Sequence, residues 1–352
     1  MARYKAVIAG ATGIVGAPLV KHLMSTGEWE VVGLARRQPA QANGVTYLSV
    51  DLTDAADCRN KLGSVDGVTH IFYTARFDHD TRLPEPIETN TAMLRHLVEA
   101  IEPNAPDLQH VHMVHGTKYY GSHRGPFQTP AREDGPRTLM DNFYYWQEDW
   151  IIDRQRNKRW GWSTSRPHGI CDFAEGIARS MVRMIAIYAA ISKELGLPLR
   201  FPGTQGNYNA IYQCTESMLL ARAVTYVSTH KNCANEGYNV INGDYIRWCN
   251  IWPRFAKYFG MELGPVQTVN LTTVMADKGP VWDRIVEKHG LRKAKLEELV
   301  VWPYGDFIWS NTDYDIMSSV TKLRQKGFHE VVDTEEMFIR IFDELRAAKV
   351  VP

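Results

Sequence analysis

The chain has 352 residues, and its 40 basic and 40 acidic side chains cancel to a formal net charge of zero. This balance gives no signature of nucleic-acid binding, and the longest apolar segments are interrupted by arginine and too short to span a membrane. The five cysteines are widely spaced without a C-x-x-C pair, which argues against disulfides and against a zinc site. With no pattern typical of a signal peptide at its start, the chain is expected in the cytosol, without a metal and with neither nucleic acid nor membrane as a partner.

The first half of the chain alternates strand patterns with amphipathic helix patterns. Continuous apolar runs predict strands at Tyr4–Ala9, Glu30–Leu34, Val45–Val50, Val68–Thr74 and Val111–His115. Helical periodicity predicts helices at Ile14–Met24, Asp54–Lys61 (with Asp54 as the cap) and Glu88–Glu102. This alternation predicts an α/β fold, a doubly wound parallel sheet of the Rossmann type with helices on both faces.

The second half of the chain is mostly helical. Helices are predicted at Ala178–Leu195, Cys214–Ser228, Ile246–Phe259, Val281–His289 and Thr334–Ala348, with short strands near Leu199–Phe201 and Tyr238–Ile241. The longest irregular stretch is Gly121–Asp141, which contains three prolines. We therefore expect a nucleotide-binding domain at 1–165, with contributions from about 211–250, and a smaller substrate-binding lobe at 166–210 and 251–352.

Three glycines stand at the junction of the first predicted strand and helix, in a G-x-x-G-x-x-G pattern. Gly10, Gly13 and Gly16 would allow a tight turn, close approach of the backbone to a pyrophosphate, and packing of the helix on the strand. The start of the helix would face the anion. The pattern predicts a dinucleotide site that includes Gly10, Thr12, Gly13, Ile14 and Gly16. A glycine-rich turn without this purpose is the alternative.

The end of the second predicted strand indicates which dinucleotide binds. Enzymes that use NAD place an acidic residue there for the ribose 2′-hydroxyl, whereas those that use NADP place arginine. This chain has Arg36 and Arg37 and no acid, and a guanidinium group pairs well with a 2′-phosphate. We therefore expect NADPH, although two solvated arginines would give the same sequence. Asp51 and Leu52, after the third strand, are predicted to meet the adenine, and Asp51 could equally begin the next helix.

A tyrosine motif in the middle of the chain departs from the Tyr-x-x-x-Lys pattern of short-chain dehydrogenases. Glu148 follows Tyr144 by four residues, and none of the 16 tyrosines has a lysine at that spacing. Lys118 instead follows the fifth predicted strand, whose carboxyl end faces the ligand crevice in this fold. Its cation could lower the pKa of Tyr144 from about 10, so that the phenol assists a developing oxyanion. The alternative is that Lys118 lies on the surface and Tyr144 is a core aromatic.

Two other groups of titratable residues have structural interpretations. Glu148 and Asp149 are expected to be helix-surface charges or structural contacts rather than a second acid pair. His110 and His112 alternate along a strand, and in the absence of clustered Cys, Asp or Glu ligands a buried packing role is favoured over a metal site.

The segment Asn142–Asp149, read as N-F-Y-Y-x-x-E-D, resembles the progesterone 5β-reductase and iridoid synthase-like (PRISE) family of atypical extended short-chain dehydrogenases/reductases. The resemblance covers nearly the whole chain and includes Gly10–Gly16, Ala35–Arg37, Thr69–Tyr73, Lys118–Tyr119, Arg166–Gly169, Tyr188–Ile191, Leu199–Gly203, Tyr238–Asp244, Gly279–Trp282 and Lys349–Pro352. It implies that Lys118 and Tyr144 are the catalytic pair of an NADPH-dependent reduction of the C=C bond of enones.

Candidate substrate contacts are Phe143, Tyr145, Tyr304 and Arg76. The arginine stands at the pocket rim, where plant members of the family tend toward aromatic or small residues. Two other functions remain open at this point. One is a nucleotide-sugar epimerase or dehydratase on the same extended scaffold, which would predict the missing Tyr-x-x-x-Lys. The other is a non-catalytic NADP(H)-sensing protein. A homodimer with a small-molecule enone as substrate is a further expectation for the chain.

Overall fold

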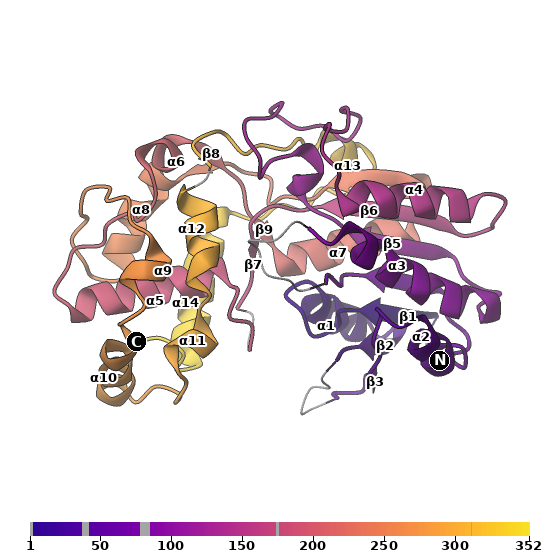
Figure 1. The fold of residues 1–352 in the computed structure, drawn as a ribbon, viewed down its shortest axis with the longest axis horizontal. Coiled ribbons are helices and arrows are strands. Elements are labelled where there is room, and N and C mark those ends of the chain that lie inside the picture. The colour runs from indigo at the N-terminus through magenta and orange to yellow at the C-terminus, as the bar shows by residue number, and fades with distance from the viewer. Residues whose placement is uncertain (1–2, 37–41, 78–84, 174–175, 311) are drawn as a thin grey trace.

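The centre of the protein is a seven-stranded parallel sheet (Figure 1), described from a computed structural model that covers residues 3–36, 42–77, 85–173, 176–310 and 312–352. The strand order is β10-β6-β5-β4-β1-β2-β3, and every neighbouring pair runs parallel. The strands are β1 (Tyr4–Ala9), β2 (Trp29–Leu34), β3 (Thr46–Leu48), β4 (His70–Tyr73), β5 (His110–Val114), β6 (Gly161–Arg166) and β10 (Glu236–Asn239). The order changes direction between β1 and β4, so the crevice for ligands opens at the carboxyl ends of these strands.

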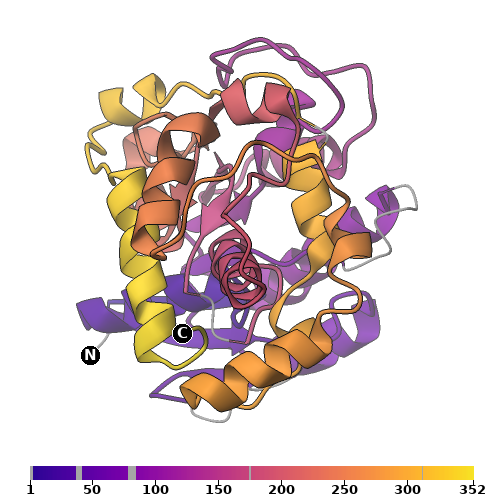
Figure 2. The same ribbon diagram turned by 90° about the vertical axis from the view of Figure 1, so that its left-hand side faces the viewer.

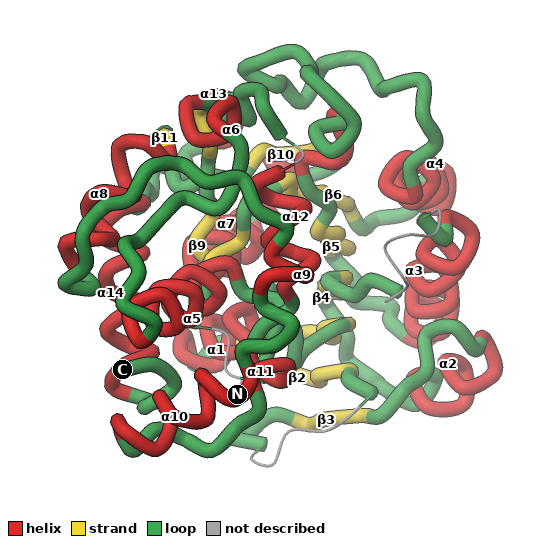
Figure 3. The backbone as a smooth tube through the Cα atoms, turned by 60° about the vertical axis from the view of Figure 1, so that its left-hand side comes forward, coloured by secondary structure: helices red, strands yellow, loops and turns green. Residues whose placement is uncertain are grey.

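Helices cover both faces of this sheet, as the alternating pattern predicts. Figure 3 shows one group of helices on one side of the strands and a second group on the other. The first group is α2 (Ala55–Leu62), α3 (Ile87–Ile101) and α4 (Phe143–Gln155), and the second is α1 (Gly16–Thr26) and α7 (Ser217–Thr229). Each group shares a buried apolar cluster with the sheet. The Rossmann-type prediction is confirmed.

A mostly helical lobe lies beside the sheet domain, and Figure 2 views the molecule from that side. Its helices are α5 (Met181–Glu194), α6 (Gln205–Asn209), α8 (Trp248–Tyr258), α9 (Leu271–Val274), α10 (Gly279–His289), α11 (Leu296–Leu299), α12 (Trp302–Ser310) and α14 (Thr334–Ala347). A second apolar core fills this lobe and contains Trp248, Trp252 and Trp309, each almost fully buried. These tryptophans therefore pack the lobe rather than line a pocket.

The remaining elements are short and join these two parts. Two-stranded ladders form between β7 (Ile170–Cys171) and β9 (Thr215–Glu216), and between β8 (Ile211–Tyr212) and β11 (Ile246–Arg247). Helix α13 (Thr321–Gln325) packs its apolar side against the sheet domain. Within the described ranges, no helix combines the length and the apolar character that crossing a membrane requires.

Two strand predictions differ from the structure. The strand β6, Gly161–Arg166, is not predicted by the sequence because it lacks an apolar run, yet its serine and threonine side chains are completely buried. The predicted strand at Leu199–Phe201 forms only an isolated bridge between Leu199 and Leu263. Prolines at 198 and 202 flank that segment and lack the N–H groups that would extend a ladder.

Candidate functional site

The glycine-rich turn after β1 is shaped by close backbone contacts. Gly10 has a φ of +79°, a left-handed conformation that glycine adopts without strain. A Cβ on Gly16, the first residue of α1, would lie 2.1 Å from the carbonyl oxygen of Gly10, so only glycine allows the helix to approach the strand. Ile14 is partly buried against the apolar cluster beneath α1. Gly16 and Ile14, both predicted to bind cofactor, therefore have packing roles in the structure.

A cavity of about 370 Å³ opens beside this turn, at the carboxyl ends of β1, β2 and β4. Its walls include most of the predicted cofactor residues, namely Gly10, Thr12, Gly13, Arg36, Asp51 and Leu52. Helix α1 begins three residues after Gly13 and has no side-chain cap. The N–H groups of Ala17 and Leu19 already bond to the carbonyl oxygens of Gly13 and Val15. Arg37 lies outside the described residues. The residues present fit a dinucleotide, with the arginine placed at the end that would carry the ribose.

The sequence left two roles open for Asp51, contact with the adenine and the start of the next helix, and the structure gives the second role to Asp54. The carboxylate of Asp54 caps α2 by accepting from the N–H groups of Ala56 and Asp57, at 2.7 and 3.2 Å. Asp51 instead accepts from the hydroxyl and N–H of Thr53, at 2.7 and 2.9 Å. These two bonds hold the pKa of Asp51 below its usual value, and the nearby Arg36 cation adds to the effect. The helix-start role belongs to Asp54, and Asp51 stays in the cavity wall.

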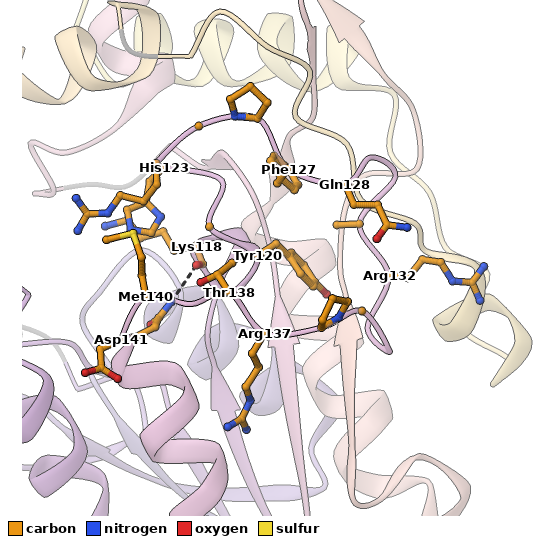
Figure 4. Close-up of a pocket in the computed structure, with 18 residues that line it drawn as sticks. Lys118, Tyr120, His123, Phe127, Gln128, Arg132, Arg137, Thr138, Met140 and Asp141 are labelled. Atoms are coloured by element: carbon orange, nitrogen blue, oxygen red, sulfur yellow. Dashed lines mark hydrogen bonds between the residues drawn. The ribbon is translucent and has the colours of Figure 1, made fainter.

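Lys118 and Tyr144 lie in segments that Asn142 ties together. Lys118 is in a 3₁₀ turn, η2 (Thr117–Tyr120), directly after β5, and Tyr144 is in the first turn of α4. The Asn142 side chain accepts from the N–H of Tyr144 at 3.0 Å. It also donates to the carbonyl oxygen of Lys118 at 2.9 Å, the bond that Figure 4 draws as a dashed line at Lys118. The Tyr144 hydroxyl is 3.5 Å from the place that a Cβ on Gly116 would take. The structure therefore places the backbone segments that carry the two predicted catalytic residues next to each other.

Glu85 connects Lys118 to the wall of the nucleotide cavity. Its carboxylate accepts from Nε and Nη2 of Arg76 at 3.1 and 2.7 Å, and its second oxygen lies 3.7 Å from Nζ of Lys118. Burial lowers the pKa of Lys118 to about 8, with a further lowering by Arg76 that Glu85 opposes. At neutral pH the lysine is thus mostly charged, close to the point at which it loses its proton. Arg76, predicted as a substrate contact, lines the nucleotide cavity and is paired with Glu85.

Tyr144 differs from the sequence-based expectation in its ionisation. Its ring stacks on His115 with centroids 4.5 Å apart, and only 9% of the residue is exposed. Burial raises the pKa of Tyr144 to about 12, against the opposing cations of Arg76 and Arg179. The expectation that its pKa falls below 10 is therefore wrong. Tyr144 is a neutral phenol at physiological pH, which makes it a hydrogen-bond donor.

Glu148 occupies the position at which the Tyr-x-x-x-Lys motif carries lysine, and it is a buried structural ion. Its carboxylate lies 3.1 Å from Nη2 of Arg166 and 2.8 Å from Nη2 of Arg137, and it accepts from the Tyr119 hydroxyl at 2.6 Å. The Arg166 guanidinium also lies 3.4 Å over the Tyr119 ring. This cluster joins β6, the η2 turn and α4. The structural-contact interpretation of Glu148 is confirmed, whereas its surface interpretation is wrong because its side chain is 6% exposed.

The long irregular segment between Lys118 and α4 encloses a second cavity, of about 400 Å³. Figure 4 shows the segment bending around it, with Lys118, His123 and Met140 near one wall and Arg132 at the other. Phe143 and Tyr145 do not line this cavity. Phe143 packs on the Tyr144 ring, and Tyr145 receives the N–H of Thr138 at 3.1 Å and donates its hydroxyl to the carbonyl of Tyr119. The structure gives both a packing role, and substrate contact by either stays a prediction.

Helix α12, in the helical lobe, faces Lys118. The ring of Phe307 lies 5.8 Å from Nζ of Lys118, and the ring of Tyr304 lies 4.7 Å from the guanidinium carbon of Arg179. Tyr304, a predicted substrate contact, thus stands close to the site, with a pKa that burial raises to about 12.

Sequence reasoning missed four residues of this site: Glu85, Asn142, Arg166 and Arg179. Asn142 alone carried a local signal, because an asparagine before a helical run is typical of an N-cap. The other three are isolated charges in the sequence, and only folding places them beside the pair. The strand histidines are explained more simply. Nε2 of His110 and Nδ1 of His112 lie 2.7 and 2.8 Å from the Ser163 hydroxyl of β6, which is the buried role that the sequence favoured.

The chain is similar to known proteins along almost its whole length. Residues 44–352 match the model of a family described as PRISE-like Rossmann-fold domain. The chain is 35% identical to the (S)-8-oxocitronellyl enol synthase of Nepeta racemosa, over 99% of this chain and 93% of the relative. It is 33% identical to the 3-oxo-Delta(4,5)-steroid 5-beta-reductase of Arabidopsis thaliana, with the same coverage.

Solved structures with the same architecture are more distant in sequence. The UDP-glucose 4-epimerase of Thermus thermophilus, in complex with NAD, matches with a TM-score of 0.66 and 17% identity, over 98% of this chain and 99% of that one. A short-chain dehydrogenase/reductase superfamily protein of Agrobacterium tumefaciens with bound NAD matches with a TM-score of 0.67 and 15% identity, over 99% and 98%. At these identities the likeness shows the fold alone, and that fold holds a nicotinamide dinucleotide in both neighbours.

Proposed function

Because the chain belongs to the PRISE-like Rossmann-fold domain family, we propose that it reduces the activated C=C bond of an enone with NADPH. The observation that carries the proposal is the Asn142 bridge, which joins the backbone of Lys118 to that of Tyr144 in a chain without the Tyr-x-x-x-Lys motif. Two curated relatives support it, since one is named an enol synthase and the other a steroid 5-beta-reductase.

NADPH is the proposed cofactor because Arg36, and no acid, stands at the end of β2 in the wall of the nucleotide cavity. Gly10, Thr12 and Gly13 would hold the pyrophosphate against the start of α1. When bound, NADPH supplies a hydride to the β-carbon of the enone. The helical lobe would supply the substrate side of the site through α12.

The chain's own residues act on the charge that then develops on the carbonyl oxygen. Tyr144 is neutral at pH 7 and donates a hydrogen bond to that oxygen, while the Lys118 ammonium adds a positive charge beside it. Such contacts accelerate the step because they strengthen as the enolate forms. Protonation of the α-carbon afterwards gives the saturated ketone.

The nucleotide-sugar epimerase alternative loses support at Glu148. Epimerases on this scaffold would need a lysine one turn after the tyrosine, and here that position carries a carboxylate paired with Arg166. A protein that only senses NADP(H) would have no need for Asn142 to join Lys118 and Tyr144.

The test is NADPH consumption with 2-cyclohexenone, followed by the near-ultraviolet absorbance of the reduced cofactor. Cyclohexanone is the matched control, because it has the carbonyl without the conjugated bond. We expect turnover of the enone alone, and a fall in kcat of about 100-fold or more in Tyr144→Phe. NADPH binding, measured by fluorescence, should persist in that variant. Consumption that is unaffected by Tyr144→Phe, or equal with both ketones, would contradict the proposal.

A further inference from the structure

Three arginine side chains gather around Lys118 and Tyr144. Arg76, Arg124 and Arg179 all act on the ammonium of Lys118, and Arg76 and Arg179 also act on the phenol of Tyr144. These residues come from the end of β4, from the irregular segment after η2, and from the segment that precedes α5. Only the folded chain assembles them.

Two of the cations, Arg179 and Lys118, lie against the same helix, α12. Tyr304 and Phe307 are three residues apart, so their rings lie on the same side of the helix. Arg179 lies over the first ring at 4.7 Å, and Lys118 lies over the second at 5.8 Å. The two cations therefore stand side by side against one aromatic wall.

Among the described residues, the carboxylate of Glu85 is the one that the structure places in an ion pair with these cations. Glu85 serves both Arg76 and Lys118, and its distance to Lys118 is 3.7 Å. Among the residues that the structure describes, Arg124 and Arg179 have no ion-pair partner. Asp141 lines the same cavity as Arg124, but Figure 4 shows its carboxylate pointing away from Lys118. Arg124 and Arg179 are solvent-exposed, so water screens part of the repulsion among these cations, and an incoming anion would relieve the rest.

We propose that the enone substrate carries a carboxylate, which Arg179 and Arg124 bind while its carbonyl oxygen meets Tyr144 and Lys118. This inference rests on the proposed function and names its substrate class. The cofactor phosphates are a weaker explanation for these two arginines. Arg36 and the glycine-rich turn already face the nucleotide cavity, whose lining includes Arg76 but neither Arg124 nor Arg179.

The test compares two substrates that differ in charge alone, (E)-6-oxohept-4-enoate and its primary amide. In the wild-type enzyme we expect kcat/KM to be at least about 10-fold higher for the carboxylate. Arg179→Met should lower this ratio about 5-fold, and Arg179→Lys should restore part of it. Added salt should lower the rate with the carboxylate more than with the amide. Arg284→Met, which removes a similar exposed charge from α10, is the matched control and should leave the ratio unchanged.

Three outcomes would overturn the inference. If the amide and the carboxylate react equally well, the substrate class is wrong, although the enone reductase proposal stands. If Arg179→Met raises the KM for NADPH and leaves the ratio unchanged, the arginine serves the cofactor. If neither compound is reduced, and the neutral 2-cyclohexenone is not reduced either, both proposals fail together.

Discussion

Replacing Glu148 tests why the usual lysine is absent from this tyrosine motif. The side chains of Glu148 and Arg166 are 6% and 3% exposed and lie 3.1 Å apart. Removing one partner of a buried ion pair costs about 3–5 kcal/mol, because the other charge is left without compensation. Arg137 remains nearby as a second cation, at 2.8 Å from the same carboxylate. We expect Glu148→Gln to lower the free energy of unfolding by about 3 kcal/mol.

Asp149→Asn is the matched control for this change. Asp149 is the next residue of the same helix and pairs with the same Arg137 at 2.7 Å, but its side chain is 60% exposed. An exposed pair contributes about 0–1 kcal/mol, so this variant should lose little stability. Urea unfolding followed by circular dichroism measures both, with the midpoint shifting at constant slope.

The same cluster decides what happens when the common motif is restored. Glu148→Lys recreates Tyr-x-x-x-Lys but places a third cation beside Arg166 and Arg137. We expect it to be less stable than Glu148→Gln and to gain no activity. If Glu148→Gln costs no more than Asp149→Asn, or if Glu148→Lys raises turnover, the buried-ion explanation is refuted.

Three further predictions concern the cofactor and the catalytic pair. Lys118 titrates at about 8 and must be charged to act, so kcat/KM should fall as pH rises through 8. Glu85→Gln removes a negative charge that favours the protonated form of Lys118. The midpoint of the pH profile of kcat/KM should therefore move down by about 0.7 of a pH unit, which corresponds to about 1 kcal/mol. An upward shift of this midpoint would contradict the prediction. Arg36→Ala should raise the KM for NADPH about 10-fold and leave that for NADH nearly unchanged, and equal effects on both would count against a 2′-phosphate contact. Asn142→Asp keeps the helix cap but cannot donate to the carbonyl oxygen of Lys118, so kcat should fall about 10-fold at an unchanged melting temperature. Asn142→Ala removes the cap as well, and should also lose about 1 kcal/mol of stability.

Local patterns in the sequence predicted the elements whose signal is local. Apolar runs identified β1, β2, β4 and β5, and helical periodicity identified α3, because burial of side chains on one face or both is what creates these patterns. The glycine-rich turn was also predicted from a local pattern, because Gly16 is required by its contact with Gly10, only six residues away in the sequence. The sequence did not predict β6, because the buried side chains of this strand are hydroxylic rather than apolar. The partners of its serines are His110 and His112 of β5.

The tertiary structure alone decided the chemistry of the pair. The sequence placed Lys118 and Tyr144 at the correct ends of their elements, but it could not give the sign of the pKa shift at Tyr144, which burial raises to about 12. Nor could it reveal that Glu148 pairs with Arg166, or that Glu85, Arg124 and Arg179 surround Lys118. Burial and Coulomb interactions depend on distances between segments far apart in the chain, and only the folded protein sets those distances.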